Sequence, residues 1–131
     1  GEDMPQKEIV QPSGMPAPTA PFSLATKLGQ LVFVAGLAVF NPQTGRAEGD
    51  IREQTRSTLE RIQGVLAGAG TTLDNVLSAT CYLANKDDFS AFNEEYTKYF
   101  PTNRPARATV MVALGPPNQL VQIQVTACVP D

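Results

Sequence analysis

The strongest structural signal in this chain is an amphipathic helix pattern that begins at Asp50. Asp50 is a favourable N-cap, and Glu53 three positions later completes a capping-box pattern. Residues on one face then recur at helical spacing: Ile51, Thr55, Leu59, Ile62, Leu66 and Ala69. Gly70 can adopt the left-handed conformation that ends many helices. A helix with one apolar face must pack against a second layer, which constrains the rest of the fold.

Strand-like segments supply that second layer. They span residues 7–10, 22–28, 31–35, 75–84, 106–113 and 120–129. The last one alternates regularly between apolar and polar residues, which is typical of a sheet with one buried face. A second helix is predicted to start after Asp87 and Asp88 and to end before Pro101. Its aromatic stripe is predicted to be core: Phe89, Phe92, Tyr96, Tyr99 and Phe100.

The predicted order is β-β-β-α-β-α-β-β, an α+β domain with two helices on one face of the sheet. A single helical layer leaves the opposite sheet face without cover. We therefore expect the chain to oligomerise through that face.

The composition fits one globular domain covering residues 1–131, with 42% hydrophobic residues. No apolar run approaches the ~20 residues that cross a bilayer, and the N-terminus lacks a signal-peptide pattern. We therefore expect a cytoplasmic protein without membrane association. The residues before Met4, Gly1 to Asp3, are expected to be an expression remnant outside the natural fold.

The chain contains no histidine, which removes Ser-His-Asp and Cys-His catalysis and imidazole metal ligands. Cys81 and Cys128 occur in apolar, strand-like segments and not in a Cys-x-x-Cys pair, so both are predicted to be buried, reduced thiols. Neither a metal nor a cofactor is expected. The net charge of −3 and the scattered Lys and Arg residues argue against nucleic-acid binding.

Arg107 is the most informative charged residue, because it lies in an apolar, strand-like segment. Alternation places it on the same face as Thr109 and Met111. A guanidinium in such surroundings needs an anionic partner, and its planar fork suits a carboxylate. The residues alone leave two alternatives open: a salt bridge between subunits, or a bound organic carboxylate. The acidic residues of the second helix are predicted to cap it or to face solvent: Asp87, Asp88, Glu94 and Glu95.

Several segments together carry a resemblance to a known family. They are Ala17-Pro18-Thr19-Ala20-Pro21-Phe22-Ser23, Val34-Ala35-Gly36, Asn41-Pro42-Gln43-Thr44-Gly45, Asp88-Phe89-Ser90-Ala91-Phe92-Asn93, Pro105-Ala106-Arg107-Ala108-Thr109-Val110 and Leu120-Val121-Gln122-Ile123-Gln124. In this order and spacing the chain resembles the RidA/YjgF family of reactive-intermediate (enamine/imine) deaminases. The resemblance implies a chorismate-mutase-like α+β fold with a six-stranded, mostly antiparallel sheet. It also implies a homotrimer with three substrate clefts between subunits.

The resemblance further implies a hydrolase acting on C–N bonds, which converts small 2-imino or 2-enamino carboxylates to 2-keto acids and ammonia without a cofactor. Arg107 matches the family arginine that binds the substrate carboxylate. Gly36 matches a glycine whose backbone lies against the ligand, and Asn93 matches an asparagine near the cleft. With the resemblance, the ligand interpretation of Arg107 is favoured over the salt bridge.

Three predicted site residues depart from the family pattern. Phe22 replaces a cleft tyrosine, Thr109 replaces a cysteine, and Gln122 replaces a glutamate that positions the attacking water; Gln124 replaces a second acidic residue. Glutamine can orient water but cannot exchange a proton near pH 7. Because a positioned acid or base contributes about 10²- to 10⁴-fold, weak or substrate-shifted activity is expected.

Two alternative functions stay open at this point. The first is a specialised enzyme for a larger unsaturated amino acid (an aminomuconate-type deaminase, a dehydratase or a tautomerase), suggested by the apolar Phe22 and Leu24. The second is a trimeric ligand-binding protein without catalytic activity, suggested by Gln122 and Phe22. Turnover of imines distinguishes the enzymes from the binding protein.

Overall fold

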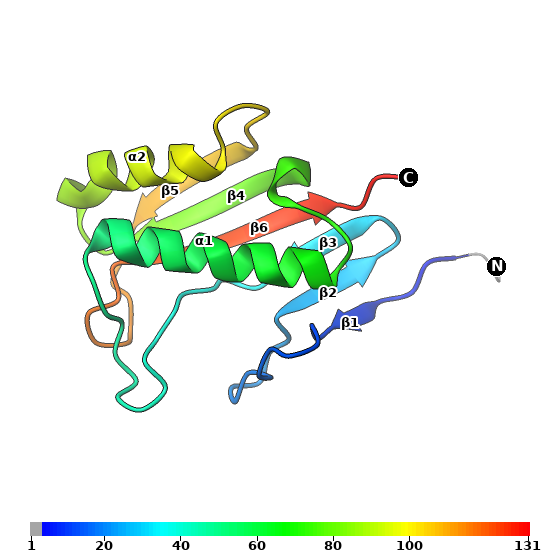
Figure 1. Cartoon of the computed structure of the whole chain (residues 1–131), viewed down its shortest axis with the longest axis horizontal. Coiled ribbons are helices and arrows are strands. Elements are labelled where there is room, and N and C mark those ends of the chain that lie inside the picture. The colour runs from blue at the N-terminus through cyan, green and yellow to red at the C-terminus, as the bar shows by residue number, and fades with distance from the viewer. Residues whose placement is uncertain (1–3) are drawn as a thin grey trace.

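A six-stranded sheet forms one layer of the computed structural model, which describes residues 4–131 (Figure 1). The expectation for Gly1 to Asp3 lies outside the described residues. In spatial order the strands are β1 (Glu8–Val10), β2 (Ala25–Leu28), β3 (Leu31–Val34), β6 (Val121–Cys128), β4 (Val76–Leu83) and β5 (Ala106–Met111). Neighbouring strands are antiparallel except β4 and β5, which run parallel. β5 is therefore an outer strand with one unpaired edge.

Two helices, α1 (Ile51–Gly68) and α2 (Phe89–Tyr99), lie on the same face of this sheet (Figure 1). The predicted capping box is present: the Glu53 amide donates to Asp50 Oδ1 at 2.9 Å, and the Asp50 amide donates to Glu53 Oε1 at 3.3 Å. Gly70 has φ +88°, as the pattern after α1 predicted. The element order and the α+β class predicted from the sequence are thus confirmed. Neither α1 nor α2, the α-helices of residues 4–131, is long and apolar enough to cross a membrane.

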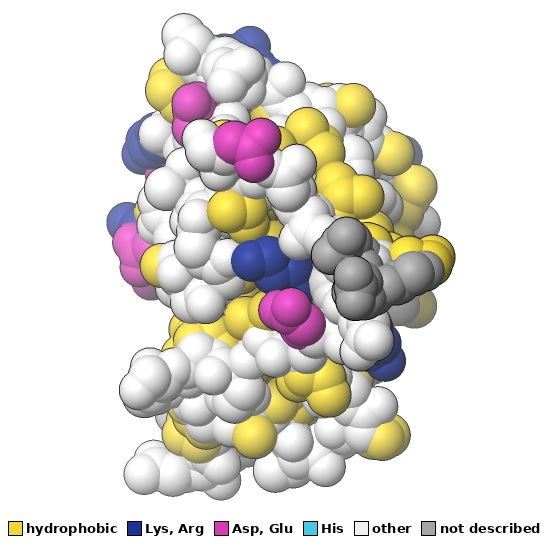
Figure 2. All heavy atoms as spheres, turned by 90° about the vertical axis from the view of Figure 1, so that its right-hand side faces the viewer, with side chains coloured by type: hydrophobic (Ala, Val, Ile, Leu, Met, Phe, Trp, Pro, Cys, Tyr) yellow, Lys and Arg dark blue, Asp and Glu magenta, His cyan; other side chains and the backbone are white. Residues whose placement is uncertain are grey.

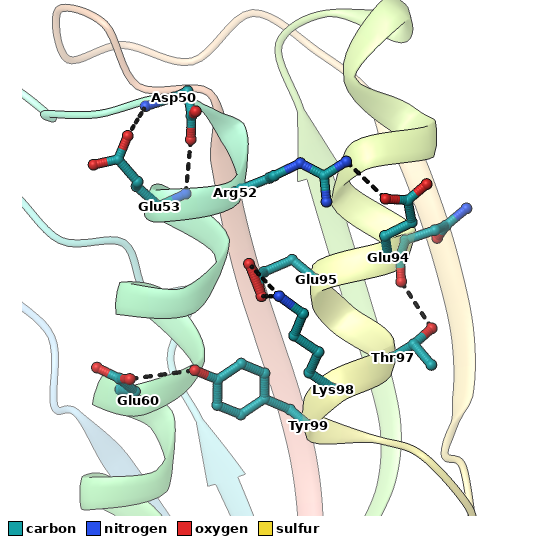
Figure 3. A network of polar contacts seen from close by, with 10 residues as sticks. Asp50, Arg52, Glu53, Glu60, Glu94, Glu95, Thr97, Lys98 and Tyr99 are labelled. Carbon is teal, nitrogen blue, oxygen red and sulfur yellow. Dashed lines mark hydrogen bonds and ion pairs between the residues drawn. The ribbon is translucent and has the colours of Figure 1, made fainter.

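The core lies between the helices and the sheet. Leu59, Ile62 and Leu66 of α1 are fully buried, together with Val32 of β3 and Ile123 of β6. Polar contacts between the helices lie outside this core (Figure 3). Arg52 pairs with Glu94 at 2.7 Å, and the Tyr99 hydroxyl donates to Glu60 at 3.2 Å. Because exposed pairs of this kind stabilise little, apolar burial is what fixes the two helices on the sheet.

The opposite face of the sheet carries exposed apolar side chains within the single chain. They are Ile9, Leu28, Leu31, Phe33 and Val110. Strand pairing places Ile9, Thr26 and Phe33 in one row across β1, β2 and β3. In Figure 2, hydrophobic side chains gather along the right-hand margin, which is the back of the sheet in Figure 1. The predicted uncovered face is therefore present.

Three side chains differ from the sequence-based expectations. Phe89 is 40% exposed instead of core, because it begins α2 at the outer strand of the sheet. Cys128 is half-buried instead of buried, because it follows the polar side of β6 onto the open face. Glu95, predicted to face solvent, is buried and pairs with Lys98 at 3.0 Å.

Candidate functional site

Arg107 lies against a set of aromatic rings at the outer edge of the sheet. It is the second residue of β5 and pairs in register with the buried Ala79 of β4. Its guanidinium carbon lies 4.8 Å from the ring centroid of Tyr96, 5.5 Å from that of Phe92 and 5.9 Å from that of Phe89. These distances are those of cation–π contacts. The side chain is therefore held beneath α2, on the helical face of the sheet.

The Arg107 guanidinium has no acidic partner in residues 4–131. The ion pairs in this part of the chain are Arg52 with Glu94 and Lys98 with Glu95. Arg107 is exposed in the single chain, and the surrounding rings carry no negative charge that would neutralise it. An arginine in this state can bind a carboxylate with two parallel hydrogen bonds.

Two buried hydroxyls lie near Arg107. Thr109 Oγ1 and Tyr96 OH are buried, and neither has a hydrogen-bond partner among the described residues. Thr109 is opposite Cys81 in the pairing of β4 and β5. Burial raises the pKa of Cys81 and that of Tyr96 to about 12 each, although the positive charge of Arg107 acts in the opposite direction. Both groups are therefore neutral at pH 7, so Cys81 is not an activated nucleophile.

Gln122 and Gly36 form a second group of predicted site residues, on the other face of the sheet. Gln122 lies between the buried Val121 and Ile123 on β6, so its side chain points away from the helices. A β-carbon at Gly36 would overlap the Gln122 amide nitrogen and lie 3.2 Å from Gln122 Cδ. Gly36 thus leaves the space that the Gln122 amide occupies. Within one protomer, Gln122 and Arg107 lie on opposite faces of the sheet.

Asn93 and Phe22 lie in different places. Asn93 is half-buried on α2, the helix whose rings surround Arg107, and its backbone carbonyl accepts from the Thr97 hydroxyl at 2.8 Å. Phe22 lines a groove together with Val39 and Phe40. Leu24, suggested by the sequence as an apolar pocket residue, is 1% exposed and belongs to the core. That part of the interpretation is wrong, because Leu24 is enclosed where it pairs with Ala35.

The structure therefore places Arg107 and Thr109 beneath α2, the helix that carries Asn93, and it brings Gly36 and Gln122 together on the open face. Sequence reasoning missed the aromatic rings around Arg107, although their spacing on the second helix was visible. Residues 4–131 contain no cluster of three or more His, Cys, Asp or Glu side chains that could hold a metal ion.

Comparisons with known proteins give the family of the chain. A family model described as endoribonuclease L-PSP matches residues 13–129. A protein of Acinetobacter baylyi named 3-aminoacrylate deaminase RutC is 39% identical over 118 residues, which cover 89% of this chain and 94% of that protein. A solved structure from Yersinia pestis, described as a conserved Rid family protein, is 36% identical with a TM-score of 0.85 and covers 95% of this chain and 100% of that one. The structure of Escherichia coli TdcF with bound serine is 27% identical in sequence, with a TM-score of 0.82. The match covers 92% of this chain and 98% of the TdcF chain.

Proposed function

This chain belongs to the endoribonuclease L-PSP family, also called RidA/YjgF, and from this membership we propose that it is an enamine/imine deaminase. It hydrolyses small 2-imino or 2-enamino carboxylates to 2-keto acids and ammonia, without a cofactor. A relative named 3-aminoacrylate deaminase supports this substrate class, and TdcF with bound serine supports an amino-acid-like ligand. We place the activity in the cytoplasm, where free thiols such as Cys81 and Cys128 stay reduced.

The active unit in this proposal is a homotrimer with sites between subunits. The observation that carries it is Arg107: an exposed guanidinium on an outer strand, without an acidic partner in residues 4–131. Gln122 lies on the opposite sheet face, so the two residues can act on one substrate only if they come from different subunits. The unpaired edge of β5 and the apolar open face supply surfaces that assembly would cover.

In the proposed reaction, Arg107 binds the substrate carboxylate, and Thr109 and Asn93 line the same side of the cleft. Gln122, held against Gly36 on the neighbouring subunit, orients a water molecule toward the carbon of the C=N bond. A 2-enamino substrate reacts as its imine tautomer. Water adds across the C=N bond, with one of its protons passing to the nitrogen, to give a carbinolamine. The hydroxyl proton then passes to the amino group as the C–N bond breaks, which releases ammonia and the 2-keto acid. Since glutamine exchanges no proton, the rate gain comes from binding and orientation. Phe22 contributes an apolar wall at the rim of the cleft.

The direct test is to generate 2-aminoacrylate in situ and to follow pyruvate formation. Because charge-assisted hydrogen bonds contribute about 1.5–3 kcal/mol, Arg107→Ala is expected to lower kcat/KM by roughly 10- to 100-fold. Arg104→Ala is the matched control, because Arg104 lies three residues earlier and its Nε donates to the Phe100 carbonyl instead. An Arg107→Ala protein as active as the wild type would remove the proposed site.

A subunit-mixing experiment tests the position of the site. Arg107→Ala and Gln122→Leu chains are co-expressed with different tags, and mixed oligomers are purified by both tags. In a cyclic trimer that contains both chains, one of the three sites combines an intact Arg107 with an intact Gln122, so recovery of about a third of the wild-type activity is expected. If the mixture is no more active than its parents, the two residues do not share a site across an interface.

Two other functions are kept for specific reasons. A binding protein without turnover is favoured by Gln122; it would show thermal stabilisation by 2-ketobutyrate but no release of keto acid from any imine. A specialised enzyme would hydrolyse larger unsaturated substrates faster than 2-aminoacrylate. The family description also names endoribonucleases, but the net charge of −3 and the absence of histidine favour the small-molecule proposal.

A further inference from the structure

A groove of about 560 Å³ lies beside α1, apart from the rings around Arg107. Segments 16–22 and 39–42 form its walls, which are mostly apolar: Pro16, Phe22, Val39, Phe40 and Pro42. Among the described residues, Arg61 of α1 contributes the only charge to this lining. A groove of this volume with apolar walls and one placed polar group has the size and composition of small-molecule sites.

The Arg61 guanidinium is fixed in place but has no anionic partner. One of its terminal nitrogens donates to the Ala38 carbonyl at 2.6 Å. This hydrogen bond holds the guanidinium next to the segment that forms the Val39 wall of the groove. Arg61 is half-buried, and in residues 4–131 it takes part in no ion pair. Burial lowers the pKa of Arg61, although an arginine stays protonated at neutral pH.

Acidic residues near Arg61 in the fold already have other partners. Glu60, its neighbour in sequence, accepts from the Tyr99 hydroxyl at 3.2 Å and is thus turned toward α2 (Figure 3). Glu48, which lines an adjacent hollow, accepts from the Asn41 amide at 2.6 Å. The remaining N–H donors of Arg61 are therefore available to a ligand.

We propose that this groove binds a small monocarboxylate with an aromatic or branched apolar body. Its carboxylate would pair with Arg61, and its body would pack against Phe22, Phe40 and the prolines. A dicarboxylate is not expected, because a second anionic group would meet only apolar walls. The site does not use Arg107, so it can be tested apart from the proposed deaminase cleft, although Phe22 is assigned to both in these proposals.

The test measures binding of phenylacetate to the full chain by calorimetry, with phenylacetamide as the neutral analogue. Saturable binding of the acid and at least tenfold weaker binding of the amide are expected. Arg61→Gln should weaken phenylacetate binding by roughly tenfold or more, as loss of a charged hydrogen-bond donor does. Arg56→Gln, an exposed arginine on the same helix, is the matched control and should bind normally.

Arg61→Gln also removes the hydrogen bond from Arg61 to the Ala38 carbonyl, so a second variant tests the site with Arg61 in place. Val39 is 39% exposed at the groove, so Val39→Asp adds a repelling charge without removing Arg61. It should also weaken binding of the acid, whereas Arg107→Ala should leave it unchanged. The proposal is overturned if phenylacetate does not bind, if acid and amide bind equally, or if Arg107→Ala abolishes binding. Deaminase activity is scored separately, so loss of this inference leaves the proposed function testable.

Discussion

The guanidinium carbon of Arg107 lies 4.8 Å from the centroid of the Tyr96 ring, which joins the outer strand of the sheet to α2 by a cation–π contact. Phe92, next along the same face of α2, adds a second ring at 5.5 Å. Arginine has many rotamers, and fixing one of them on binding costs conformational entropy. Rings that hold the guanidinium before a ligand arrives reduce that cost.

Tyr96→Leu is therefore expected to raise KM more than it lowers kcat. A cation–π contact contributes about 0.5–2 kcal/mol, so the rise in KM should be roughly two- to thirtyfold. Tyr96→Phe keeps the ring and serves as the control, with KM close to that of the wild type. Steady-state assays below the melting temperature of each variant measure both constants. Equal KM values for the leucine and phenylalanine variants would show that the ring does not position Arg107.

Thr109→Val tests whether the unpaired Thr109 hydroxyl serves a ligand. The buried Oγ1 has no hydrogen-bond partner in residues 4–131, so its removal should leave the free energy of unfolding unchanged or raise it by about 1 kcal/mol. If the hydroxyl binds substrate beside Arg107, KM should rise about tenfold. Thr58→Val is the matched control, because Thr58 Oγ1 is also buried without a hydrogen-bond partner among the described residues but lies on α1, away from Arg107. An unchanged KM in Thr109→Val would remove Thr109 from the site.

The fold was predictable where local periodicity is strong. The spacing after Asp50 gave α1 correctly to within two residues, and the alternation of the last segment gave β6. The strand predicted from residue 22 instead begins at Ala25, because a turn in which the Phe22 amide donates to the Ala20 carbonyl precedes it. The strand order and the parallel pairing of β4 with β5 depend on contacts between distant residues, which no local pattern reports.

The candidate site was predictable only in part, for a related reason. Alternation correctly placed Arg107 and Thr109 on one face of their strand. Alternation within one strand does not show which residues of β5 and β6 share a face of the sheet. The placement of Arg107 and Gln122 on opposite faces was therefore not predicted. Phe92 and Tyr96 have the spacing of core residues and are indeed buried. Their second role, beside a cation from another element, is visible only in three dimensions.

Gly36→Ala is expected to damage the site while leaving most of the fold intact. The new β-carbon would overlap the Gln122 amide nitrogen, so the Gln122 side chain must move. Displacement of a positioning group by about 1 Å can cost up to about 10²-fold in rate. Combining Gly36→Ala with Gln122→Ala makes room for the methyl group, so stability to urea should return while kcat stays low. A Gly36→Ala enzyme with wild-type kcat would argue against a role for Gln122 in placing water.

The buried thiol of Cys81 is expected to lower the free energy of unfolding at alkaline pH. Burial raises the pKa of its thiol from 9.0 to about 12, so above pH 9 the unfolded chain releases a proton that the folded chain retains. The free energy of unfolding should therefore fall as pH rises from about 9 toward 12, by at most about 1.4 kcal/mol per pH unit from this group. Urea unfolding at pH 8 and pH 10, with a reducing agent present, measures the effect; Cys81→Ala should flatten it, whereas Cys128→Ala retains Cys81 and its contribution. Equal pH dependence in wild type and Cys81→Ala would mean that the thiol meets water in the folded protein, and the packing of β4 beneath α2 would need revision.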